Sequence, residues 1–146
     1  MSTEDTIDLD SITASKEATQ KVGVKFDDDG NPTAGFVIVG KDSHQYRSAE
    51  QRLRAAALKR QAQKSQRIDS KTDEGSVTLA RLIDKNDEEL AVAVVVDWFG
   101  FTSGGAPATF TTEAVRKAFQ ARPSWREKVS ASLENEAGFT QSSPTN

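Results

Sequence analysis

The sequence predicts an α+β fold, in which an N-terminal β-hairpin precedes a mainly α-helical bundle of four to five helices. Between residues 21 and 40, apolar residues alternate with polar ones around a run of turn-forming residues, as in a half-buried hairpin. From residue 48 onward, apolar residues recur every three or four positions, which is typical of amphipathic helices. Both tryptophans and most of the seven phenylalanines follow residue 94, so the core is expected there.

The chain of 146 residues is long enough for one domain. Residues 1–20 are polar and acidic with scattered aliphatics, which predicts a flexible N-terminal arm, with a docking arm as the alternative. Residues 21–139 form the single predicted domain. The polar segment 140–146 is predicted to be a disordered tail.

Composition excludes several kinds of site. The chain has no cysteine and one histidine, so disulfides, thiolate metal sites, cysteine nucleophiles and histidine metal clusters are excluded. A net charge of −3 argues against the whole chain binding nucleic acid. The acidic start is unlike a secretory signal, and no apolar run reaches the roughly 18 residues of a membrane helix. We expect a soluble cytoplasmic protein that uses no cofactor or metal.

The predicted hairpin, residues 21–40, has strands at 22–26 and 36–39 joined by the turn residues 27–32. Its three consecutive aspartates suggest a calcium loop. The spacing does not fit, because position 12 counted from Asp27 is Ile38, where an EF-hand requires a bidentate glutamate. The aspartates are therefore interpreted as a solvated turn.

A strongly basic helix is predicted at about 48–67, opened by the capping-box pattern of Ser48 and Gln51. The next predicted helix, about 76–97, is rich in acidic residues over its first half. Opposite charges favour an antiparallel pair, within one chain or between subunits; a solvated face and a nucleic-acid footprint are the alternatives. Helix 76–97 ends in an apolar valine run, where a strand is a second interpretation.

A glycine-rich loop follows, without the lysine and serine or threonine of a phosphate-binding loop. Thr111 or Thr112 is predicted to cap a helix at 112–121, which Pro123 ends. The last helix, about 124–137, begins either with a capping box at Ser124 or with Pro123 in its first turn. Gly138 is its predicted C-cap.

No catalytic constellation stands out among the 22 carboxylates, and His44 lies in a polar segment typical of the surface. The chain is therefore expected not to be an enzyme. The large aromatics of the C-terminal half are candidate partner-binding residues, with burial in the core as the alternative for each. They are Trp98, Phe99, Phe110, Phe119, Trp125 and Phe139.

The same region resembles the tail assembly chaperones of long-tailed phages and prophages. The resemblance rests on Trp98 with Gly100, the segment Pro107 to Val115, then Phe119, Pro123 and Trp125 before a helix ending in Ala137-Gly138-Phe139. The hairpin also fits the N-terminal half of that family. Two departures are Phe119, where many relatives carry a leucine pair, and the long basic helix.

The resemblance implies a non-catalytic protein of the host cell cytoplasm that is absent from the mature virion. Such proteins bind the helical tape measure protein, keep it soluble and help to recruit tail tube subunits; self-association is also expected. The alternative function is a phage structural or head–tail protein, or one that binds nucleic acid through the basic helix, residues 52–67.

Overall fold

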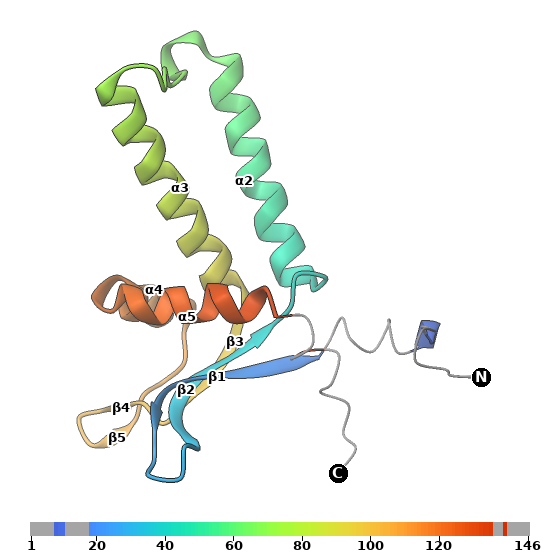
Figure 1. The fold of residues 1–146 in the computed structure, drawn as a ribbon, viewed down its shortest axis with the longest axis vertical. Coiled ribbons are helices and arrows are strands. Elements are labelled where there is room, and N and C mark those ends of the chain that lie inside the picture. The colour runs from blue at the N-terminus through green and yellow to red at the C-terminus, as the bar shows by residue number, and fades with distance from the viewer. Residues whose placement is uncertain (1–7, 11–17, 136–138, 140–146) are drawn as a thin grey trace.

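The computed structural model describes residues 8–10, 18–135 and 139. A three-stranded antiparallel sheet carries helices α4 and α5 on one face, and a long helical hairpin, α2 and α3, projects from this body (Figure 1). The predicted α+β class is confirmed.

The predicted hairpin is strands β1 (Thr19–Phe26) and β2 (Pro32–Val39), which pair antiparallel. The Asp27 side-chain oxygen accepts hydrogen bonds from the backbone N–H groups of Asp29 and Asn31, both at 2.9 Å. One aspartate of the acidic run thus stabilises the turn, as aspartates commonly do. β1 starts inside the segment predicted as a flexible arm, because Thr19 and Gln20 pair with the end of β2.

Strand β3 (Val95–Phe99) corrects the prediction of a helix through residue 97. Helix α3 (Asp73–Val94) ends where the valine run begins to pair with β2, with Val95 opposite Ile38 and Trp98 opposite Phe36. β-branched residues fit a half-buried strand well, and the free edge of β2 supplies hydrogen-bond partners. The strand interpretation of this segment is therefore correct.

Helix α2 (His44–Ala62) begins earlier than predicted and is followed by a short 3₁₀ helix, η1 (Lys64–Gln66). The cap is the buried Ser43, whose hydroxyl accepts from the Tyr46 N–H at 3.2 Å; the prediction of Ser48 as cap is wrong. The α2 helix stops at Ala62 because Gln63 adopts an extended conformation. Helix α3 likewise starts before residue 76, since the Thr72 hydroxyl caps it through the Gly75 N–H.

Helix α4 (Thr112–Ala121) has the predicted bounds, and Thr111 caps it through the Ala114 N–H at 3.0 Å. Helix α5 (Pro123–Leu133) starts with proline in its first turn and has no side-chain cap, so the capping box at Ser124 is wrong. Because Glu134 ends the helix, α5 is shorter than predicted. The predicted last turn and cap, residues 136–138, lie outside the described residues.

Between β3 and α4 the chain forms a small ribbon of β4 (Thr102–Ser103) and β5 (Ala106–Pro107). The core lies between the sheet and helices α4 and α5. Phe36 is fully buried at its centre, with ring centroids 5.3 Å from Phe101, 5.1 Å from Phe119 and 6.1 Å from Trp125. The aromatic region therefore forms the core, as predicted.

Candidate functional site

Three of the five exposed large apolar side chains among the described residues belong to the helical arm, defined here as residues 50–90 of α2, η1 and α3. Its outer part stands clear of the sheet and of α4 and α5 (Figure 1), while Asp84, Glu88 and Glu89 near its base contact α4 and α5. None of the residues 50–90, all of which the structure describes, is buried. Leu58 is 63% exposed, Val77 50% and Ile83 52%. Large exposed apolar side chains gathered on one element indicate a protein-docking surface.

A cleft of about 570 Å³ separates the two helices in the outer half of the arm. Ala57, Ile68, Leu79 and Leu82 supply its apolar lining. Arg60, Gln61 and Arg67 supply its polar lining. An apolar floor with cationic neighbours suits an amphipathic helix that carries acidic residues beside its apolar stripe.

The arm separates charge between its two helices. Basic residues predominate on α2 and η1, and acidic residues predominate on α3, which also carries Arg81 and Lys85. The basic set is Arg52, Arg54, Lys59, Arg60 and Lys64, and the acidic set is Asp73, Glu74, Asp84, Asp87, Glu88 and Glu89. The predicted antiparallel pair forms, yet over the described residues no ion pair joins α2 to α3. Instead Glu50 of α2 contacts Arg47 at 3.1 Å and Arg54 at 3.9 Å on the same helix. Apart from Glu88 and Glu89, which contact α4, the acidic side chains of α3 and the basic side chains of α2 thus form no ion pair with each other and remain available to another molecule.

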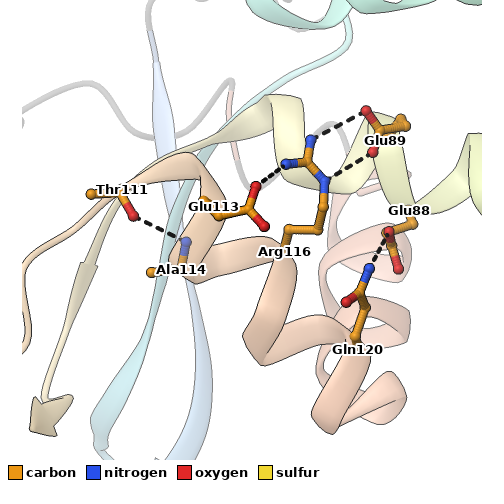
Figure 2. A network of polar contacts seen from close by, with 7 residues as sticks. All are labelled: Glu88, Glu89, Thr111, Glu113, Ala114, Arg116 and Gln120. Atoms are coloured by element: carbon orange, nitrogen blue, oxygen red, sulfur yellow. Dashed lines mark hydrogen bonds and ion pairs between the residues drawn. The ribbon is translucent and has the colours of Figure 1, made fainter.

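The base of the arm is held to the body by Arg116 of α4 (Figure 2). Its guanidinium donates to both carboxylate oxygens of Glu89, at 3.2 and 3.3 Å, and to Glu113 at 3.0 Å. Gln120 donates to Glu88 at 3.3 Å. The hydrogen bond with Glu89 is the main reason that the pKa of Arg116 is raised, while partial burial opposes the rise. These contacts fix where α3 leaves the body.

We expect Arg116→Ala to lower the free energy of unfolding by about 1 kcal/mol, because a bidentate but partly exposed ion pair is lost. The side chains of Arg116 and Glu89 are 27% and 22% exposed. Urea unfolding at low and high salt measures the effect, with Lys117→Ala on the exposed side of α4 as control. Equal stability of the two variants would contradict this role.

The six candidate aromatics lie in the body, not in the arm. Phe119 and Phe139 are buried, and Trp98, Phe110 and Trp125 are partly buried against the core. Phe99 differs: it is opposite Gly35 in the β2–β3 register, next to the core-facing Trp98. Successive strand residues alternate faces, so Phe99 lies on the sheet face away from α4 and α5. Lys21 Nζ lies 5.4 Å from its ring centroid. Partner contact by these six residues stays a prediction.

The exposed residues Leu58, Val77 and Ile83 were not among the candidates that the sequence indicated. The signal that could have found them is an apolar residue amid charged ones on a long helix. That pattern also describes a helix packed against a body, so sequence periodicity alone does not separate the two cases.

His44 is exposed, as predicted, and its ring nitrogen lies 3.3 Å from the Ser48 hydroxyl. Within residues 8–10, 18–135 and 139, no three histidine, aspartate or glutamate side chains are placed to hold a metal ion. In the same residues no helix is long and apolar enough to span a membrane.

Comparison with protein-family models, with curated proteins and with solved structures gives no match to the chain.

Proposed function

We propose that this protein is a non-catalytic tail assembly chaperone of a long-tailed phage or prophage. It binds the tape measure protein in the host cytoplasm, keeps it soluble, helps to recruit tail tube subunits, and is absent from the mature virion. The observation that carries the proposal is the cleft between α2 and α3, whose apolar lining is Ala57, Ile68, Leu79 and Leu82. The resemblance of the segment from Trp98 to Phe139 to that family supports it.

The arm suits a long helical client for a physical reason. A client helix with an unpaired apolar stripe aggregates unless another apolar surface covers that stripe. Two antiparallel helices with a cleft between them receive a third helix, and Leu79 and Leu82 line that cleft. Basic residues on one side and acidic residues on the other would orient the client through its charges.

We expect co-expression with the tape measure protein of the same genome to keep that protein soluble and co-eluting in size exclusion. Replacing Leu79 and Leu82 by serine should reduce the co-eluting client by about tenfold or more, because apolar contact area is lost. The control is Phe26→Ser, which removes an apolar side chain that is 50% exposed on the body. A client that stays insoluble with the wild-type chain would refute the proposed function.

Nucleic-acid binding by residues 52–67 is a second candidate, favoured by one observation. Arg52 and Lys59 are exposed and make no ion pair with the neighbouring acidic helix. That acidic helix would itself repel phosphates. Binding of a duplex that falls steeply with salt, and is lost in Arg52→Glu with Lys59→Glu, would establish this function in place of the chaperone.

A further inference from the structure

The helical arm lacks the packing that normally stabilises helices of its length. Helices in proteins owe most of their stability to burial of an apolar face, and none of the residues 50–90 is buried. We propose that the arm pairs with the arm of a second copy of this chain, so that the basic α2 of each copy lies on the acidic α3 of the other. This self-pairing does not rest on the proposed chaperone function.

The surface involved contains one large apolar residue from each helix, Leu58 of α2 and Ile83 of α3. On α2, Arg54 and Leu58 are four residues apart and share a stripe. On α3, Ala80, Ile83 and Asp87 share a stripe in the same way. Since Ala57 and Leu79 line the cleft between the antiparallel helices, a rotation of about 100° per residue brings both stripes to one side of the arm.

Leu58 and Ile83 lie outside the contacts between the arm and the body. Helix α4 contacts α3 through Glu88 and Glu89 (Figure 2), and Arg126 of α5 donates to the backbone carbonyl of Asp84 at 3.4 Å. Ile83 is about 100° or more around the helix from each of these three residues of α3. Leu58 and Ile83 are accordingly 63% and 52% exposed. Two such surfaces brought face to face would cover these side chains and complete a four-helix bundle, the usual solution for hairpins with an apolar side.

The charges on the two helices indicate that a second copy of the chain binds to this surface. A partner for this surface needs an acidic helix over α2 and a basic helix over α3, and the chain itself carries that combination. In a two-fold pair the same contact occurs twice. Arg54 of one copy would then face Asp84 and Asp87 of the other, and none of these charges is engaged with the opposite helix of its own chain.

The charges also determine how the two arms are oriented. The tip of each arm is the connection between α2 and α3. When both tips lie at the same end, the two-fold axis runs between the two arms and parallel to them, so that α2 of one copy lies over α3 of the other. With the tips at opposite ends, face-to-face packing places α2 over α2 and joins two basic helices. Like charges across an interface are strongly unfavourable, so the structure favours tips at the same end.

Sedimentation equilibrium of the full chain tests the proposal. We expect a dimer that dissociates as salt is raised, because exposed charges are screened. Arg54→Glu should weaken the dimer by about tenfold or more, and so should Asp84→Lys with Asp87→Lys. Mixing these two variants should restore a dimer, since opposite charges then face each other at both contacts. Arg52→Glu, about a third of a helical turn or more from the stripe, is the control and should dimerise normally.

Recovery of the dimer on mixing the two charge variants would show that each variant is folded and had lost only the ability to pair with itself. A second test uses the absence of cysteine from the chain: Leu58→Cys mixed with Ala80→Cys should give a disulfide between the two variants on oxidation. A wild-type chain that is monomeric at all concentrations up to about 100 µM would overturn the proposal, since that limit corresponds to only about 5.5 kcal/mol of association. Charge variants that dimerise like the wild type, or a mixture that stays monomeric, would overturn it as well.

Discussion

Replacing Phe36 with alanine is expected to lower the free energy of unfolding by about 3–5 kcal/mol, a large share of the stability of a small domain. Phe36 is 0% exposed and is the ring against which Phe101, Phe119 and Trp125 pack. Removing it leaves a cavity between the sheet and helices α4 and α5, and the three surrounding rings lose contacts that they cannot replace without moving the backbone.

Urea unfolding followed by tryptophan fluorescence measures this effect, because Trp125 is in contact with the altered site. Phe26→Ala is the matched control: the same substitution on the same sheet, at a side chain that is 50% exposed, should cost about 1 kcal/mol or less. Similar losses in the two variants would mean that the centre of the core is not at Phe36.

The parts of the fold that could be predicted from the sequence have local causes. The turn at Asp27 forms through hydrogen bonds within four residues, and its residue types are typical of turns. Helix α4 begins at a threonine cap and ends before a proline, so the residues next to its two ends determine its bounds. Such signals do not depend on what the segment later packs against.

The parts that could not be predicted depend on distant residues. Val95 becomes a strand residue because β2, more than fifty positions earlier, offers a free edge, and the local pattern allowed both helix and strand. Ser43 and Ser48 are both plausible caps by sequence. Ser43 is chosen because its hydroxyl also donates to the Gly40 carbonyl at 2.6 Å, where the chain leaves β2.

The candidate site shows the same division. The sequence indicates an oppositely charged helical pair, and the structure forms it as an antiparallel hairpin. It also indicates the C-terminal aromatics, of which Phe119 and Phe139 are buried in the core. Burial is a property of the assembled fold, so an aromatic residue in the core and one in an interface have the same sequence signature. The exposure of Leu58 and Ile83 could not be predicted from the sequence, because it depends on how the arm projects from the body.

Substitution of Gly100 by alanine is expected to destabilise the protein by about 2–5 kcal/mol, for two separate reasons. Gly100 follows β3 with a φ of +80°, a conformation that costs other residues about 1–2 kcal/mol. An added Cβ would also collide with the carbonyl oxygen of Thr33 and lie 2.7 Å from the Cα of Ala34, both on β2. Relieving this overlap requires backbone movement, at a further cost of about 1–3 kcal/mol.

Gly104→Ala separates these two contributions. Gly104 has a φ of +61°, but nothing lies within 4 Å of an added Cβ, so only the conformational cost of about 1–2 kcal/mol applies. Thermal unfolding of both variants should therefore show a clearly lower Tm for Gly100→Ala. Because Gly100 joins Trp98 to Phe101, whose ring centroids are 5.0 Å apart, that variant should also change the near-ultraviolet circular dichroism, and Gly104→Ala should not. Equal Tm values would show that the loop after β3 moves away from β2 at little cost, so that the close approach of Gly100 to Thr33 does not hold the aromatic core in place.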